Sequence, residues 1–162
     1  MKDVDVTSDQ LVAISQLQNR YARCIDADRL EDWPDFFTDD GFYSVTSAEN
    51  HRAGLPAGLI WLDGIGMIRD RVTALRDANI YERHGYRHIL GQPYVDGRDE
   101  HGDTRVETSF FVVRITRDGQ TDVFASGSYH DSLREVDGAL KFARRVVVCD
   151  SSHIDTLLGL PL

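Results

Sequence analysis

The hydrophobic period of this chain changes once, near Tyr86, and this change restricts the possible folds more than any other feature of the sequence. Before it, apolar residues recur three to four positions apart, which is typical of one face of a helix. After it, β-branched and aromatic residues alternate with polar ones, which is typical of strands. The order predicts an α+β fold, in which N-terminal helices pack on a curved, mostly antiparallel sheet.

The first helix is predicted from a start signal and an apolar stripe. Residues 7–10 (Thr-Ser-Asp-Gln) fit a capping box, in which the Thr7 hydroxyl and the Gln10 amide satisfy free backbone groups. The helical spacing that follows predicts one buried face. That face consists of Leu11, Ile14, Leu17, Tyr21, Cys24 and Ile25.

Shorter elements are predicted up to Tyr86. Residues 30–37 indicate a short helix with Pro34 in its first turn, and residues 39–41 (Asp-Asp-Gly) indicate a turn. A strand is expected over residues 42–46. Residues 47–58 contain three Gly or Pro breakers and predict an irregular loop.

A third helix is predicted after Asp63, which is suited to cap it. Its charged residues, including Arg76, are interpreted as a solvated face. Its inner face consists of Ile65, Ile68, Val72 and Leu75.

Long strands are predicted in the second half, over residues 86–95, 104–116, 121–133 and 140–150. Asp-Gly pairs predict turns at residues 96–97, 118–119 and 137–138. Strands joined by such short connections are antiparallel, because a parallel crossover needs about a dozen residues.

Length, charge and cysteine content limit the class of protein. The 162 residues predict one domain over 1–162, because domains cluster near ~100–150 residues. The net charge of −9 repels nucleic acid and anionic lipid. No apolar run approaches the ~18–20 residues that cross a bilayer, and residues 1–10 do not resemble a signal peptide. Cys24 and Cys149 are interpreted as buried thiols, so we expect a soluble, cytoplasmic protein without nucleic-acid or membrane partners.

The six histidines form no recognisable metal motif. The closest pair, His84 and His88, lies ~13 Å apart if the segment is extended, too far for one metal with ~2 Å bonds. The sequence lacks the paired Cys-x-His and Cys-x-x-His runs of a Rieske cluster, a glycine-rich phosphate loop and a Gly-x-Ser-x-Gly elbow. We therefore expect no catalytic, cofactor-binding or metal-binding residue in this chain.

One set of residues could still carry chemistry if the fold brings it together in a pocket. It consists of Tyr21, Asp26, Tyr43, His88 and Tyr129. A His–Asp pair with tyrosine donors suits proton transfer next to a carbonyl group. The alternative is that these are hydrogen-bonded polar groups of the core.

Two other sets are candidates for subunit interfaces. Four arginines lie among apolar strand residues, where a long stem and a planar guanidinium suit ion pairs at an interface. They are Arg83, Arg87, Arg144 and Arg145, and we expect some of them at an interface. The C-terminal tail is too apolar for a free terminus in water. Its leucines are Leu157, Leu158, Leu160 and Leu162.

Over essentially its full length, the chain resembles the β (small) subunits of Rieske non-haem iron ring-hydroxylating dioxygenases. The resemblance rests on residues 21–26 (YARCID), 32–37 (DWPDFF), 78–90 (ANIYERHGYRHIL), 123–127 (VFASG), 148–158 (VCDSSHIDTLL) and 161–162 (PL). Small subunits of terephthalate dioxygenases and salicylate 5-hydroxylases are the most similar, through residues 49–51 (ENH), 54–55 (GL) and Trp61.

The resemblance implies an NTF2-like (SnoaL-like) cone that is a structural, non-catalytic subunit of an α3β3 hexamer with β–β contacts. The Rieske [2Fe–2S] cluster and a mononuclear Fe(II) are then expected in the α (large) subunit, with electrons from NAD(P)H arriving through a separate reductase. The expected substrate is a carboxylated aromatic such as terephthalate or salicylate. Which acid it is, and whether it is dioxygenated or monohydroxylated, the sequence leaves open.

Two alternatives stay open at this point. Distant relatives of the same fold, such as scytalone dehydratase and ketosteroid isomerase, use the cone pocket for acid–base chemistry. A stand-alone dehydratase or isomerase would use Asp26 and His88 in this way. A ligand-binding module would use the same pocket without turnover.

Overall fold

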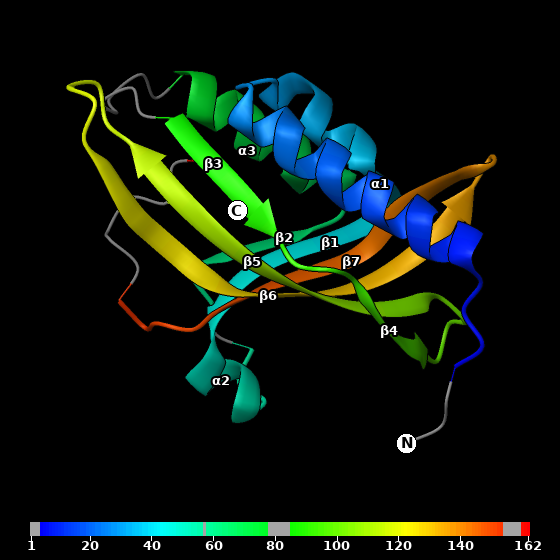
Figure 1. Cartoon of the computed structure of the whole chain (residues 1–162). Helices are drawn as coiled ribbons and strands as arrows, with labels where there is room; N and C mark the ends of the chain where they lie inside the picture. The colour runs from blue at the N-terminus through cyan, green and yellow to red at the C-terminus, as the bar shows by residue number, and fades with distance from the viewer. Residues whose placement is uncertain (1–3, 57, 78–84, 154–159) are drawn as a thin grey trace.

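The computed structural model describes residues 4–56, 58–77, 85–153 and 160–162. In these, the helices of residues 8–26, 30–36 and 65–77 lie on one side of a strongly curved sheet, and the short helix of residues 48–52 lies on the other (Figure 1). The helices are α1 (Ser8–Asp26), the 3-10 helix η1 (Leu30–Phe36), α2 (Ala48–Arg52) and α3 (Ile65–Asp77). The strands are β1 (Phe37–Ser47), β2 (Ile60–Asp63), β3 (Gly85–Leu90), β4 (Tyr94–Arg98), β5 (Thr104–Ile115), β6 (Thr121–Val136) and β7 (Ala139–Cys149).

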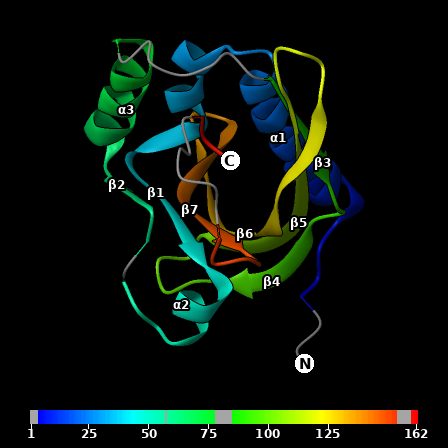
Figure 2. The ribbon, with the colours of Figure 1, turned by 90° about the vertical axis from the view of Figure 1, so that its left-hand side faces the viewer.

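The sheet has the strand order β2-β1-β7-β6-β5-β3, with β4 paired to the remaining length of β5. All neighbouring strands are antiparallel except β1 and β7, which are parallel. The packing of α1, η1 and α3 on one face of a mostly antiparallel sheet confirms the predicted α+β class. Figure 2 shows the sheet wrapping around an interior that α1 and η1 cover.

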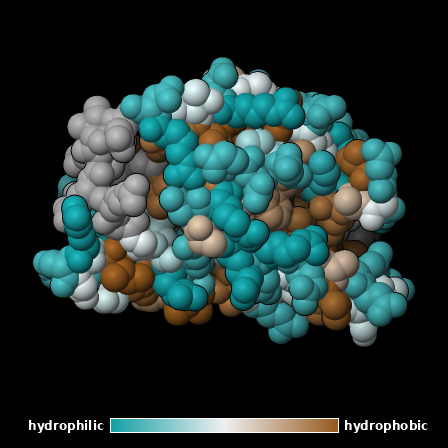
Figure 3. Space-filling model, turned by 90° about the horizontal axis from the view of Figure 1, so that it is seen from above, coloured by the Kyte–Doolittle hydropathy of each residue, from teal (hydrophilic) through white to brown (hydrophobic). Residues whose placement is uncertain are grey.

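Helix α1 follows its sequence signals closely. The Thr7 hydroxyl accepts from the Gln10 N–H at 3.2 Å and the Gln10 side chain accepts from the Thr7 N–H at 3.0 Å, which confirms the capping box. The predicted stripe is buried from Ile14 to Ile25, and Gln18 is buried with it. The opposite face is hydrophilic, as the view onto the helices shows (Figure 3).

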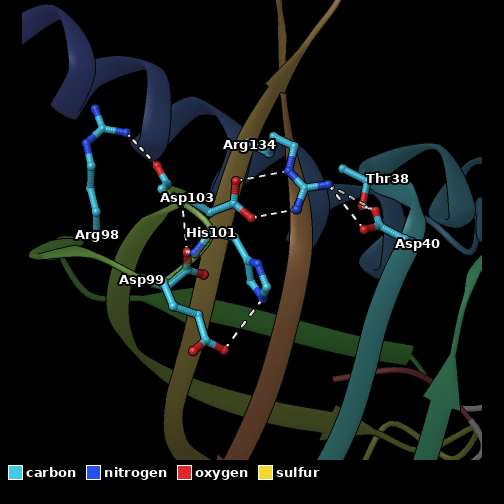
Figure 4. Close-up of polar contacts among 9 residues, drawn as sticks. Thr38, Asp40, Arg98, Asp99, His101, Asp103 and Arg134 are labelled. Carbon is cyan, nitrogen blue, oxygen red and sulfur yellow. Dashed lines mark hydrogen bonds and ion pairs between the residues drawn. The ribbon is translucent and has the colours of Figure 1, made fainter.

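The predicted turn at residues 39–41 is wrong, because β1 runs through it with an irregularity in register between Phe37 and Phe42. Asp40 accepts from Thr38 at 2.7 Å and from Arg134 at 3.1 Å, and Arg134 also binds Asp103 on the β4–β5 side (Figure 4). Residues 39–41 therefore form an irregular part of the strand instead of a turn, and the ion pairs of Arg134 stabilise it.

Two short elements lie between β1 and α3, and the first of them falls in the region predicted as loop. Helix α2 begins after Ser47, whose hydroxyl accepts from the Asn50 N–H at 3.1 Å, so an irregular loop over residues 47–58 is wrong. Strand β2 pairs with β1 and ends at Asp63. Gly64, with φ 91°, separates Asp63 from α3, so Asp63 does not occupy the predicted cap position.

The predicted strand over residues 86–95 divides into β3 and β4 around Pro93, which has no N–H for a ladder hydrogen bond. The Asp-Gly pair at 96–97 lies inside β4, at an irregularity between Val95 and Arg98, and the turn follows it instead. In that turn the Asp99 carboxylate accepts from the Asp103 N–H at 3.0 Å. The predicted strands β5, β6 and β7 are confirmed to within three residues at each end.

The interior is filled by aromatic rings from the helices and the sheet. Trp33 lies edge-on to Phe37 and to Tyr43, with ring centroids 5.4 Å and 5.0 Å apart. Tyr21 lies edge-on to Phe142 at 5.4 Å. Among the described residues, no helix is long and apolar enough to cross a membrane.

Candidate functional site

Asp26 and His88 form a direct pair, as the pocket hypothesis requires. Asp26 ends α1, and His88 lies in β3 beside it. One Asp26 carboxylate oxygen lies 2.6 Å from His88 Nδ1, and the other accepts from the His88 N–H at 2.9 Å. The His88 side chain is fully buried, and its Nε2 has no hydrogen-bond partner among the described residues. The carboxylate thus fixes both the strand and the imidazole.

Tyr21 and Tyr43 do not contact this pair through their hydroxyl groups. Both hydroxyls donate to the main-chain oxygen of Leu162, at 2.8 Å and 3.3 Å. The Leu162 N–H in turn donates to the Tyr43 oxygen at 3.0 Å. Burial raises the pKa of both tyrosines, so both stay protonated as donors.

Leu162 is wholly buried in this chain, so its predicted place in a subunit interface is wrong. Leu160 is partly buried and packs against the same core. Leu157 and Leu158 lie outside the described residues.

Tyr129 of β6 is also buried, and burial raises its pKa. Its ring stacks on Phe110 with centroids 4.6 Å apart, and its hydroxyl has no hydrogen-bond partner in the described part of the chain. The five residues of the hypothesis therefore separate into a His–Asp pair, two tyrosines bound to Leu162 and one packed tyrosine.

A second polar cluster lies in the interior, and sequence reasoning missed it. The Arg145 guanidinium donates to both Asp131 oxygens, at 2.8 Å and 2.7 Å, and also donates to the Gln18 side-chain oxygen. Gln18 donates back to Asp131 at 2.7 Å. The side chains of Arg145 and Asp131 have no solvent exposure. The prediction of an interface role for Arg145 is therefore wrong.

Aromatic rings surround the guanidinium of Arg145. Its central carbon lies 4.1 Å from the Tyr21 ring centroid and 3.9 Å from those of Tyr129 and Phe142. Burial lowers the pKa of Arg145, but Asp131 more than offsets this, so the pKa is raised and the charge is retained. Ring faces and a bidentate carboxylate together stabilise a cation inside the core.

The other predicted interface arginines differ from Arg145. Arg87 and Arg144 are exposed on the outer face of the sheet, and Arg144 lies 4.5 Å from the Phe42 ring centroid. Arg83 lies outside the described residues, as does His84 of the closest histidine pair. Arg76, predicted to be solvated, is exposed but binds Asp28 and Glu31 at 2.9 Å and 2.6 Å.

Surface pockets lie away from the His–Asp pair. A pocket of about 370 Å³ between α1, η1 and the β6–β7 hairpin is lined by Arg20, Arg23, Arg29 and Lys141 together with Asp32 and Asp35. A second pocket borders the start of α1 and β4, and a third borders α1 and the connection between β3 and β4. None of these three includes Asp26 or His88 in its lining. Within the ranges 4–56, 58–77, 85–153 and 160–162, no group of three or more potential ligands could hold a metal ion.

Comparison with known proteins gives consistent matches along the chain. A family model described as a SnoaL-like domain matches residues 7–146. Two β subunits of the terminal oxygenase component of terephthalate 1,2-dioxygenase from Comamonas sp. are 48% identical over 93% of this chain and 97% of their own length. The anthranilate 1,2-dioxygenase small subunit of Burkholderia cepacia is 41% identical over 92% of each chain.

A solved structure matches almost the whole chain as well. It is the β subunit of an aromatic-ring-hydroxylating dioxygenase from Novosphingobium aromaticivorans, with a TM-score of 0.87 and 35% identity. The match covers 98% of this chain and all of that one. The predicted cone fold is thereby confirmed.

Proposed function

This chain belongs to the SnoaL-like family and, within it, to the small (β) subunits of aromatic-ring-hydroxylating dioxygenases, and from this we propose that it supports the terminal oxygenase for a carboxylated aromatic such as terephthalate. The observation that carries the proposal is the 48% identity to terephthalate 1,2-dioxygenase β subunits over 97% of their length. The relatives named above are subunits of terephthalate and anthranilate dioxygenases, and salicylate appears in none of their names.

We place the cofactors in the partner. Our proposal is an α3β3 hexamer with β–β contacts, in which a large α subunit holds a Rieske [2Fe–2S] cluster and a mononuclear Fe(II). A separate reductase would deliver electrons from NAD(P)H. Cys24 and Cys149, the only cysteines of the sequence, are both buried and lie in different elements, which does not fit a cluster site in this chain. Buried free thiols and the need for NAD(P)H favour a cytoplasmic location.

The interior supports a structural role for this single domain. The Tyr21 and Tyr43 hydroxyls are bound to Leu162, and both Asp26 oxygens are bound to His88. Groups that are satisfied within the chain stabilise the fold. We therefore propose that no residue of this chain takes part in catalysis.

The outer face of the sheet offers a surface for the partner. Ile89 of β3 and Phe111 of β5 are exposed neighbours in the strand register, and Val123 is exposed on β6. On β1 and β2, the exposed Trp61 lies edge-on to Phe42 at 4.7 Å. Exposed apolar groups of this size are typical of protein interfaces, so we propose that the α subunit covers this face.

The purified chain alone is expected to be colourless, to hold less than about 0.1 iron or zinc per chain and to oxidise no aromatic acid. Co-expression with the cognate large subunit should give a coloured hexamer of two chain types, because the clusters enter with that subunit. Size-exclusion chromatography with light scattering and elemental analysis measure both results. One tightly held metal per isolated chain would refute the proposal.

Replacing Asp26 with Asn or His88 with Gln tests the alternative acid–base function. If Asp26 and His88 only support the fold, either substitution should lower the free energy of unfolding by about 1–3 kcal/mol, because a buried partner loses its hydrogen bond. Turnover per assembled complex, normalised to iron and Rieske absorbance, should stay within a few-fold of wild type.

A general acid or base would behave differently, since its removal lowers the rate by about 10²–10⁴ while assembly persists. His101→Gln is the matched control, because His101 is exposed on the β4–β5 turn and far from the interior. A collapse of normalised turnover in fully metallated complexes of Asp26→Asn or His88→Gln, but not of His101→Gln, would establish a catalytic role for this chain.

A further inference from the structure

Residues 160–162 lie inside the fold although they follow the last strand of the sheet. Figure 2 shows the C-terminal end of the chain within the space that the sheet and α1 surround. Pro161 is buried, and Leu162 has no solvent exposure. This segment occupies the interior as a bound molecule would.

The contacts of Leu162 have the form of ligand recognition. One main-chain oxygen accepts from two tyrosine hydroxyls, and the N–H of the same residue donates to one of them. The two donors come from different elements, since Tyr21 is on α1 and Tyr43 is on β1. Two convergent donors on one oxygen, beside an apolar side chain, define a polar head and an apolar body.

The tyrosines are positioned by residues outside the segment. Tyr21 lies edge-on to Phe36 and Phe142, and Tyr43 lies edge-on to Trp33. The Arg145 guanidinium lies over the face of Tyr21. Because these contacts do not involve residues 160–162, the site should keep its shape when the segment leaves.

We propose that Tyr21 and Tyr43 form a latent binding site for small carboxylic acids or ketones with a compact apolar body, which residues 160–162 of the chain itself occupy as a plug. The segment and a free ligand compete for the same two hydroxyl groups. Binding of such a ligand therefore requires release of the segment. The site is separate from the Asp26–His88 pair in its hydrogen bonds.

The test uses the full chain and two altered chains that empty the site to different extents. One lacks residues 160–162, and the other carries Leu162→Gly, which removes the apolar body and keeps the main chain. The probes are the tripeptide N-acetyl-Leu-Pro-Leu, which copies residues 160–162, and 4-methylpentanoate, which is leucine without its amino group. Isothermal titration calorimetry measures binding, and circular dichroism verifies the fold.

The truncated chain should bind the tripeptide at least tenfold more tightly than wild type, in which the site is occupied. The Leu162→Gly chain should bind 4-methylpentanoate, and wild type should not. Tyr43→Phe in the truncated chain should weaken tripeptide binding by about tenfold or more, since the hydroxyl that both donates to and accepts from Leu162 is lost. Tyr94→Phe is the control without effect, because Tyr94 is exposed on β4.

Binding that is equal in wild type and truncated chain, or unchanged by Tyr43→Phe, would overturn the proposal. A folded truncated chain that binds neither probe would do the same. If the truncated chain does not fold, restoration of its fold by millimolar tripeptide supports the proposal. The proposal is refuted if the tripeptide does not restore the fold and the Leu162→Gly chain does not bind 4-methylpentanoate.

Discussion

Replacing Asp131 with Asn is expected to lower the free energy of unfolding by about 3–5 kcal/mol, because it removes one partner of a fully buried ion pair. The change keeps the size of the side chain and removes the charge that faces Arg145. The guanidinium then stays in the core among Tyr21, Tyr129 and Phe142 without a counter-ion. Urea denaturation at pH 7, followed by circular dichroism, measures the loss.

The matched control is Asp28→Asn, which makes the same change in an exposed ion pair with Arg76. Exposed pairs contribute about 0–1 kcal/mol, so this variant should be close to wild type. Adding Arg145→Met to Asp131→Asn should recover part of the loss, since the uncompensated charge is removed. A loss below about 1 kcal/mol for Asp131→Asn would show that water reaches Arg145 and screens its charge.

The sequence predicted those parts of the fold in which local signals and tertiary structure agree. Helix α1 has a capping box and a regular stripe, and the β6–β7 hairpin has Asp137 and Gly138, whose φ values of 51° and 78° suit a two-residue turn. Residues 39–41 gave the opposite result. They have the composition of a turn but lie in an irregular part of strand β1, where Asp40 binds Arg134 of β6.

The buried Arg145 could not be found from alternation, because β7 does not alternate regularly. Phe142 pairs with Leu133, but Arg144 pairs with Ser132, so Ala143 is an extra residue. A bulge of this kind shifts the strand by one position and exchanges its inner and outer faces. Regular alternation from Phe142 would point Arg144 inward and Arg145 outward, the reverse of the structure.

The candidate site was predicted in part. The pocket hypothesis named Asp26 and His88 as residues that could converge, and they are in contact. It also placed Tyr21 and Tyr43 in one interior, where they share a partner. That partner, Leu162, was predicted to lie in a subunit interface. Its apolar side chain indicates burial but does not indicate whether its own chain or a partner buries it. Which surface buries it depends on the path of the chain after β7, and no local pattern encodes that path.

Replacing Gly127 with Ala is expected to destabilise the centre of the sheet by about 1–3 kcal/mol or more, because the new methyl group has no space. Gly127 of β6 pairs with Cys149 of β7. An added Cβ would overlap the Val148 carbonyl oxygen and lie 2.9 Å from the Val148 carbonyl carbon and 3.0 Å from the Cys149 Cα. All three are backbone atoms, so relief requires the two strands to separate locally.

That separation should also weaken the end of β7, where the Asp150 N–H donates to the Ser126 carbonyl oxygen at 2.9 Å. Hydrogen exchange should therefore rise at Asp150, in addition to the shift of the urea midpoint. Gly85→Ala is the matched control, because Gly85 is also in a strand and a Cβ there meets no atom of the described residues within 4 Å. It should change stability by less than about 0.5 kcal/mol. Equal stability of the two variants would contradict this prediction. It would mean that the backbones of β6 and β7 leave room for a methyl group at Gly127.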